Sequence, residues 1–163
     1  MSENYIVING KKAELTPEQL KALGIEVKKS SPFEMGEEGS EYYFITSYGS
    51  TMKSNTCKSN NSDLRHRVAN YCADETLLLQ QAYREALNRL LWRFSMEHGG
   101  KEVVWNGRTR NWKIKFHNKR WIAEWNTEDH VLGCVYFCSQ NVAEQAIEEI
   151  VKPFMAAHPD FKF

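Results

Sequence analysis

One long amphipathic segment constrains the fold of this chain more than any other feature. Between residues 75 and 98, apolar side chains recur at spacings of three and four residues, which is the period of one face of an α-helix. Asp74 precedes the segment as a helix N-cap, and Gly99 and Gly100 follow it as a stop. The apolar stripe consists of Leu79, Ala82, Tyr83, Ala86, Leu87, Leu90, Leu91 and Phe94. We therefore predict a helix over residues 75–98 that is the organising element of the core.

The beginning of the chain predicts a hairpin and a short helix. Residues 5–15 contain two β-prone runs around an Asn-Gly pair, which favours the tight turn of an antiparallel hairpin. Thr16 and Gln19 have the spacing of a capping box, in which each side chain bonds the backbone of the other. Gly24 then predicts the end of the helix. Residues 28–32 predict a linker.

The residues between the linker and the long helix predict further strands. Residues 42–46 are strongly β-prone, and Gly49 indicates a turn after them. Residues 50–62 are rich in Ser, Asn, Thr and Lys, so they form either an exposed loop or a weak second strand. Residues 65–72 predict a third strand.

The second half of the chain repeats the order of the first. Its pattern predicts strands over residues 112–116, 120–125 and 131–137. Ser139 then caps a helix over residues 140–152, which Pro153 is expected to end. When Asp74 is matched to Ser139, Cys72 falls on Phe137. Both an internal duplication and a common α+β arrangement explain this order.

These elements predict the α+β class, with small antiparallel sheets packed on helices. We expect three parts. The first, residues 1–30, is the hairpin with its short helix, and the second, residues 31–99, is a strand-rich unit with the long helix. The third, residues 100–163, is a second hairpin-strand-helix unit.

Charge is unevenly distributed, although the whole chain is neutral with 21 basic and 21 acidic residues. Residues 53–121 contain 14 Lys or Arg against 6 Asp or Glu, whereas residues 1–52 contain 5 against 8 and residues 122–163 contain 2 against 7. Segregated charge creates local fields that attract partners of the opposite sign. The basic middle therefore indicates contact with a polyanion or with an acidic protein surface.

Two groups of residues are the candidate partner-binding sites. Residues 101–121 interleave basic side chains with tryptophans, a mixture that suits phosphates and stacked bases. We expect one surface from Arg108, Arg110, Lys113, Lys115, Lys119 and Arg120, with Lys113 and Lys115 on the solvent face of a strand and Trp112 on its core face. The second group is Arg89, Trp92 and Arg93, on the long helix away from its apolar stripe. Trp92 either packs on the second half of the chain or anchors a partner, and we favour packing.

Several classes of protein are disfavoured by the sequence. It contains no glycine-rich phosphate-binding motif, no His-Glu-x-x-His frame and no secretion signal. Cys134 and Cys138 have the spacing of one zinc knuckle but lack a second pair of ligands, so we expect free thiols, no metal and no other cofactor. No apolar run reaches the roughly 18 residues of a membrane span, and we expect a cytoplasmic protein that makes no membrane contact. A small hydrolase or a nucleotide-sequestering protein stays open as a third class.

Several motifs in residues 5–94 support a resemblance to a known group. They are INGKKAELTPEQLKALGIE, PFEMGEEGSEYYFITSYGS, and the residues Asp63, Arg65, Asn70 and Tyr71 within DLRHRVANYCADETLLLQQA. Together they resemble small proteins encoded by phages and prophages of Gram-positive and gut bacteria. In that group a glycine is usual where this chain has Ala69, and a phenylalanine where it has Cys72. The resemblance implies an accessory protein of a mobile element and implies no reaction.

The sequence therefore predicts a non-enzymatic phage or prophage protein that binds a host protein or a protein–nucleic-acid complex. Its most concrete form is an inhibitor of a nucleic-acid-handling defence system, of the anti-CRISPR kind. The alternative is a regulator that binds DNA or RNA directly through residues 101–121.

Overall fold

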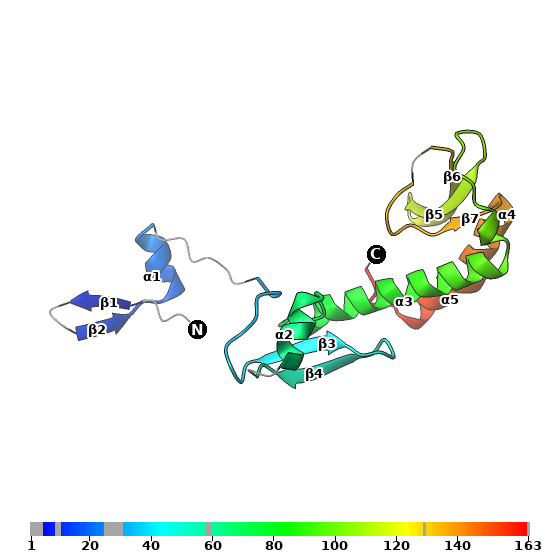
Figure 1. The fold of residues 1–163 in the computed structure, drawn as a ribbon. Helices are drawn as coiled ribbons and strands as arrows, with labels where there is room; N and C mark the ends of the chain where they lie inside the picture. Colours follow the sequence, from blue (N-terminus) through cyan, green and yellow to red (C-terminus); the bar gives the residue numbers. More distant parts are fainter. Residues whose placement is uncertain (1–4, 9–10, 25–30, 58–59, 129, 163) are drawn as a thin grey trace. The chain divides into compact units, whose positions relative to one another are not determined.

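The computed structural model describes residues 5–8, 11–24, 31–57, 60–128 and 130–162. Helices and small antiparallel sheets make up the fold (Figure 1), which confirms the α+β class. The chain divides into two compact units, the first comprising Met1–Phe44 and Met52–Glu75 and the second Ile45–Thr51 and Thr76–Phe163. This division falls at the start of the long helix, whereas the sequence analysis placed a boundary after it.

The described residues begin with a hairpin and a short helix. Strands β1 (Tyr5–Ile8) and β2 (Lys11–Glu14) pair antiparallel. Helix α1 (Pro17–Ala22) starts at Thr16, whose Oγ1 accepts a hydrogen bond from the Gln19 N–H at 3.3 Å, while the Thr16 N–H donates to Gln19 Oε1 at 2.8 Å. The predicted hairpin and capping box are confirmed. The Asn-Gly turn and residues 28–30 of the predicted linker lie outside the described residues.

A second hairpin follows along the chain. It pairs β3 (Glu41–Ile45) with β4 (Thr51–Asn55). Gly49 in the connecting turn has a φ of 83°, a left-handed conformation that glycine adopts without strain. The predicted strand over residues 42–46 is therefore confirmed. Of the two alternatives for residues 50–62, the second strand is confirmed for residues 51–55.

The predicted third strand over residues 65–72 is wrong. Residues Asn60–Arg67 form helix α2, and of residues 68–72 only Cys72 joins the sheet, through an antiparallel bridge to Tyr43. Between helix α2 and Cys72 the backbone turns at Ala69, whose φ is 55°. Glycine adopts this left-handed conformation without strain because it has no Cβ to clash, whereas alanine does not.

Aromatic side chains hold α2 and the segment after it on β3. Arg65 donates to the Tyr42 hydroxyl at 2.6 Å, and its guanidinium lies 3.5 Å from the centre of the Phe44 ring. Tyr71 stacks on Tyr42 with ring centres 4.5 Å apart, and its hydroxyl accepts the Gly36 N–H at 2.8 Å. These contacts join segments far apart in the sequence, so they override local strand propensity in residues 65–67. Several motif residues of the resemblance are therefore packing residues of the first unit.

In the second unit, helix α3 (Glu75–Glu97) confirms the predicted long helix and is drawn in green in Figure 1. A 3₁₀ turn, η1 (Gly100–Glu102), follows it. The helix contributes Leu87, Leu91 and Phe94 to one buried cluster, and the rest of that cluster comes from the C-terminal third of the chain: Phe137, Ala143, Ala146, Val151, Phe154 and Phe161. The predicted apolar stripe is therefore the core face of α3 except at its start, where Leu78, which was not predicted, is buried and the predicted Leu79 is only partly buried.

The sheet of the second unit has the order β6–β5–β7. Strands β5 (Asn111–His117) and β6 (Arg120–Asn126) form the predicted hairpin, and β7 (Tyr136–Phe137) pairs antiparallel with β5. Asn118 and Lys119 in the hairpin turn have φ values of 48° and 63°, the mirror-image turn that suits the twist of antiparallel strands.

Most of the predicted strand over residues 131–137 is a turn. Gly133 has a φ of 78°, and the Cys134 N–H donates to the Val131 carbonyl at 3.2 Å. The Tyr136 hydroxyl accepts the Val131 N–H at 3.0 Å, which holds this turn beside β7. The apolar residues before β7 are therefore in a loop, because the backbone reverses at the glycine.

The last helical region continues beyond Pro153, contrary to the prediction. Ser139 caps α4 (Gln140–Ala146) as predicted, by accepting the Val142 N–H at 3.3 Å. A π-helical turn, η2 (Ile147–Val151), then leads directly into α5 (Lys152–Ala157). Pro153 therefore lies within a continuous helical region, where the wider π turn just before it accommodates the missing N–H and relieves the usual clash with a preceding carbonyl.

The two halves of the chain share one pairing pattern. After each hairpin, a residue pairs antiparallel with the first strand of that hairpin, Cys72 with Tyr43 in the first half and Phe137 with Trp112 in the second. Both Cys72 and Phe137 are completely buried. In each half the next helix begins three residues later (72 to 75, and 137 to 140). The predicted match between the two halves is therefore reproduced in the strand pairing.

Replacing Ala69 by glycine should stabilise the first unit. A left-handed residue with a Cβ loses roughly 1–2 kcal/mol, and glycine loses about 0.5–1 kcal/mol more entropy on folding than alanine does, so a net gain of about 0.5–1 kcal/mol is expected. The measurement is the free energy of unfolding from denaturant titration. The control Ala156→Gly, within α5, should lower stability by a similar amount. An Ala69→Gly protein less stable than the wild type would contradict the left-handed turn.

Truncating the core face of α3 should destabilise the second unit. Leu87→Ala removes buried methyl groups and should lower the free energy of unfolding by about 2–5 kcal/mol. Leu77, on the same helix, has a side chain that is 45% exposed, so Leu77→Ala should cost much less. Equal losses in the two variants would show that Leu87 is not in the core.

Candidate functional site

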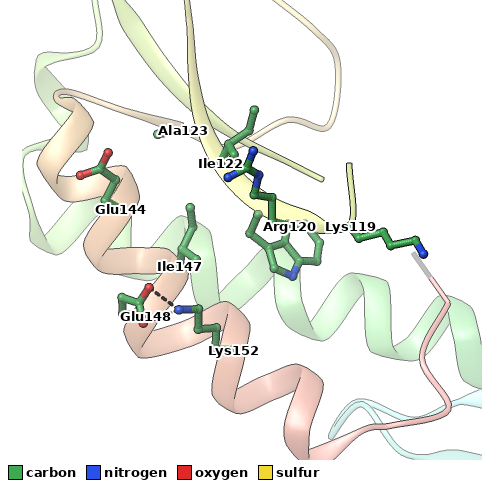
Figure 2. A pocket seen from close by; sticks show the side chains of 9 residues that line it. Lys119, Arg120, Ile122, Ala123, Glu144, Ile147, Glu148 and Lys152 are labelled. Atoms are coloured by element: carbon green, nitrogen blue, oxygen red, sulfur yellow. Dashed lines mark hydrogen bonds and ion pairs between the residues drawn. The ribbon is translucent and has the colours of Figure 1, made fainter. Parts of the chain in front are cut away.

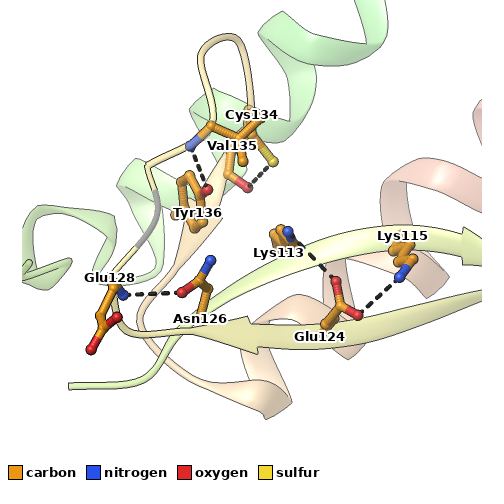
Figure 3. A network of polar contacts seen from close by, with 9 residues as sticks. Lys113, Lys115, Glu124, Asn126, Glu128, Cys134, Val135 and Tyr136 are labelled. Atoms are coloured by element: carbon orange, nitrogen blue, oxygen red, sulfur yellow. Dashed lines mark hydrogen bonds and ion pairs between the residues drawn. The ribbon is translucent and has the colours of Figure 1, made fainter. Parts of the chain in front are cut away.

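The predicted basic surface lies on the β5–β6 hairpin and the loop before it. Lys113 and Lys115 share one face of β5, and both reach the carboxylate of Glu124 on β6, at 3.5 Å and 3.0 Å (Figure 3). The opposite face of β5, with Trp112 and Ile114, packs against the hydrophobic cluster, as the alternation predicted. The hydrogen bond from Lys115, with the charges of both lysines, holds the pKa of Glu124 below its ordinary value. This carboxylate therefore offsets part of the charge of two predicted partner-binding residues.

Arg110 lies on the other side of this hairpin. Its guanidinium is 4.6 Å from the centre of the Trp125 ring, and Trp125 is the register partner of Trp112 on the core-facing side. Arg108 is exposed in the preceding loop, where its N–H and the Thr109 N–H both donate to Asn106 Oδ1. The expectation that all six basic residues form one surface is therefore wrong, because successive strand residues point to opposite faces.

Lys119 and Arg120 belong to a groove of about 680 Å³ along strand β6. One wall consists of residues 119–123, and the other consists of helical side chains from α4, η2 and α5 (Figure 2): Glu144, Ile147, Glu148 and Lys152. Its volume falls within the roughly 300–1,000 Å³ that is typical of ligand pockets. A smaller pocket, of about 260 Å³, is lined by residues of the first unit.

The charges in this groove are only partly paired. Lys152 forms an ion pair with Glu148 at 2.5 Å, and Glu144 accepts a hydrogen bond from Gln140 at 2.8 Å. Within the described part of the chain, neither Lys119 nor Arg120 has an ion-pair partner. The end of the groove near the hairpin turn is therefore cationic.

Trp92 lies on the solvent side of α3, with its side chain 59% exposed. The prediction that it packs on the second half of the chain is wrong, because the core stripe occupies the opposite side of the helix at about 100° per residue. Arg89 and Arg93 flank it. Their guanidinium nitrogens lie 3.3 Å from Glu85 Oε2 and 4.0 Å from Glu97 Oε1, respectively. An exposed tryptophan between two arginines is thus the main feature of this helix side.

Cys72 and Cys134 lack the character of an activated nucleophile. Burial raises the pKa of the Cys72 and Cys134 thiols, so both stay protonated at neutral pH, whereas a nucleophilic cysteine is a thiolate. All four cysteines are free thiols, and Cys57 is exposed. Among the residues that the structure describes, no three His, Cys, Asp or Glu side chains cluster as metal ligands, and no helix is long and apolar enough to cross a membrane.

Comparisons with known protein families, with curated proteins and with solved structures found no match. The resemblance of residues 5–94 to phage proteins therefore stays a prediction, and the function has to be argued from the geometry of the second unit.

The acidic partners of the basic residues were not predicted from the sequence. Glu124 occupies the strand position opposite Lys113, so the hairpin register could have indicated it. The helical wall of the groove was also missed, although Glu144, Glu148 and Lys152 recur at intervals of four residues on one predicted helix. That spacing places them on one side of a helix but does not reveal that strand β6 lies beside it.

Replacing Glu124 by glutamine should have a pH-dependent effect. Because the pKa of this carboxylate is lowered in the folded state, its stabilising effect is present above the unfolded-state pKa and is lost as the pH falls through the folded-state pKa. Glu124→Gln should therefore cost up to about 1 kcal/mol at pH 7, a small amount because the pair is exposed to solvent. Thermal unfolding of both proteins from pH 7 to pH 3 measures the difference. If the difference in melting temperature between the wild type and Glu124→Gln became larger toward low pH, the ion-pair assignment would be refuted.

Proposed function

We propose that this protein is a non-enzymatic accessory protein that binds a host protein through the solvent side of helix α3. The observation that carries the proposal is Trp92, a large apolar side chain left 59% exposed beside Arg89 and Arg93. Leaving a tryptophan ring in water forgoes the free energy of its burial, and tryptophan and arginine are the residues most enriched at energetic hot spots of interfaces. Burial of this ring by a partner would recover that free energy.

The charges around Trp92 favour a protein partner over nucleic acid. Arg89 and Arg93 each have a glutamate of the same helix within ion-pair distance, so this part of the surface is close to neutral. Affinity for DNA or RNA depends on unopposed cations that release counterions from phosphates. A neutral surface with a central aromatic ring is typical instead of the core of a protein–protein interface.

The concrete form of the proposal is a phage or prophage inhibitor of a nucleic-acid-handling defence system, of the anti-CRISPR kind, acting in the bacterial cytoplasm. The resemblance of residues 5–94 to phage accessory proteins supports the origin. The segregation of acidic and basic segments supports a target that itself binds nucleic acid, because such targets carry strong fields of both signs. This step to counter-defence rests on analogy and not on the geometry of α3.

The alternative is direct nucleic-acid binding through residues 101–121. The exposed Arg108 and the unpaired Lys119 and Arg120 favour it, whereas Glu124 offsets the charge of Lys113 and Lys115. Phosphate binding by these residues would give a steep fall in affinity with rising salt.

Replacing Trp92 by alanine should separate binding from folding. The exposed ring adds little to stability, so the melting temperature should stay within a few degrees of the wild type, since exposed substitutions usually change stability by at most about 0.5 kcal/mol. Loss of a hot-spot tryptophan weakens binding by about 2 kcal/mol or more, which is about thirtyfold. The measurement is quantitative capture of host proteins from nuclease-treated lysate, followed by the affinity of the captured target.

Trp125→Ala is the matched control, because Trp125 is 47% exposed on a different surface of the same unit. It should capture the target as the wild type does. Undiminished capture by Trp92→Ala would refute the α3 surface. Loss of the target on nuclease treatment, together with a steep salt dependence, would favour the nucleic-acid alternative.

A further inference from the structure

The groove along β6 carries opposite charges at its two ends. Lys119 and Glu144, which both line it, lie at opposite ends in Figure 2. Arg120 adds a second cation on the strand wall, next to Lys119 in the chain. On the helical wall, Glu148 and Lys152 neutralise each other at 2.5 Å. The groove is therefore cationic near the hairpin turn and acidic near α4.

The charges at the two ends are not neutralised within the described part of the chain. Among those residues, Lys119, Arg120 and Glu144 belong to no ion pair. The Glu144 carboxylate accepts a hydrogen bond from the uncharged side chain of Gln140 at 2.8 Å. A partner whose charges run in the opposite order along the groove would neutralise both ends.

A second copy of this chain presents that opposite order. In a two-fold symmetric interface both copies use the same surface, so this surface has to be complementary to itself. A groove with a single sign of charge would repel its own copy, whereas a groove with one cationic and one acidic end meets the requirement. The two-fold rotation places the Lys119 end of each copy against the Glu144 end of the other.

We propose that this groove is the interface of a symmetric homodimer, in which Lys119 and Arg120 of each copy face Glu144 of the other. The helical wall forms a ridge beside the groove, and helix ridges pack into grooves of matching width. Ile122, which is partly exposed in the groove, is covered by the same contact. The proposal does not depend on Trp92 and goes beyond the binding of a host protein.

Charge favours a second copy over nucleic acid in this groove. A nucleic-acid strand carries one sign of charge, so Lys119 and Arg120 would attract it while Glu144 would repel it. Two copies of this chain do not repel each other as a whole, because each has 21 basic and 21 acidic residues. A net charge near zero promotes association between copies.

The hairpin turn keeps a cation at the end of the groove against its backbone preference. Asn118 and Lys119 have φ values of 48° and 63°, and tight turns of this kind favour Asn followed by Gly. Glycine would be unstrained at residue 119, yet the chain has a lysine there. On the opposite wall, Ile147 and Glu148 belong to the π-helical turn η2, and π-helical turns occur frequently at functional sites. Both walls therefore carry local features that a regular hairpin and a regular helix lack.

The first test is the mass of the purified full chain by analytical ultracentrifugation over a wide range of concentration. We expect a monomer–dimer equilibrium that shifts toward the monomer as salt rises, because salt screens exposed charges. The double variant Lys119→Glu, Arg120→Glu should raise the dimer dissociation constant by about tenfold or more, since like charges then face each other. The matched control, Lys101→Glu, Arg108→Glu, changes the net charge equally on exposed residues outside the groove and should dimerise as the wild type does.

A charge exchange tests the pairing itself. The double variant Glu144→Lys, Glu148→Lys should also be monomeric, because cations then face cations. Mixing it with Lys119→Glu, Arg120→Glu should restore a dimer that contains one copy of each variant, since the facing ends are again opposite in sign. Melting temperatures within a few degrees of the wild type would show that each variant is folded when it fails to dimerise alone.

A wild type that stays monomeric at every concentration would overturn the proposal. So would a dimer that persists in Lys119→Glu, Arg120→Glu, a mixture of the two groove variants that remains monomeric, or a control variant that dissociates as readily as they do. Trp92→Ala should dimerise as the wild type does. Loss of the dimer in that variant would place the interface on α3 and would likewise overturn the proposal.

Discussion

The packing of helix α3 against the C-terminal helical region is the interaction on which the second unit depends. Leu87, Leu91 and Phe94 form one buried cluster with Phe137 and, among other residues, Val151. This cluster uses one side of α3 and one face of the β5–β6 hairpin. Because those sides are buried, the opposite side of the helix and the groove along β6 are left for other contacts. Both candidate binding surfaces are thus consequences of how a single core is built.

Electrostatic pairing then distinguishes among basic residues that look equivalent in the sequence. A single carboxylate, Glu124, lies beside both Lys113 and Lys115, whereas Lys119 and Arg120 have no such partner among the described residues. An exposed ion pair adds little stability, but it removes much of the field that would attract a phosphate or a carboxylate. An anionic ligand is therefore better sought at these unpaired cations than at the densest run of positive charge.

The two halves of the chain use the same strand pairing to close their hairpins. Each hairpin is closed by a segment that returns to its first strand, at Cys72 and at Phe137, and each of these residues is completely buried. In the first unit, Tyr42 and Tyr71 stack at this junction. The residues on which the predicted resemblance to phage proteins rests therefore include packing residues of the first unit. They carry no information on the partner, which is why the functional argument rests on the second unit.

The sequence by itself determined the features whose partners lie within a few residues. These include the capping box at Thr16, the N-cap at Ser139 and the core face of α3, because a cap or a helical face depends only on local spacing. The tertiary structure decided the rest. It made residues 60–67 a helix through contacts with β3, left Trp92 exposed, and brought a π-helical turn beside β6 to form a groove. Periodicity shows which side chains share a face, but only the assembled chain shows what covers that face.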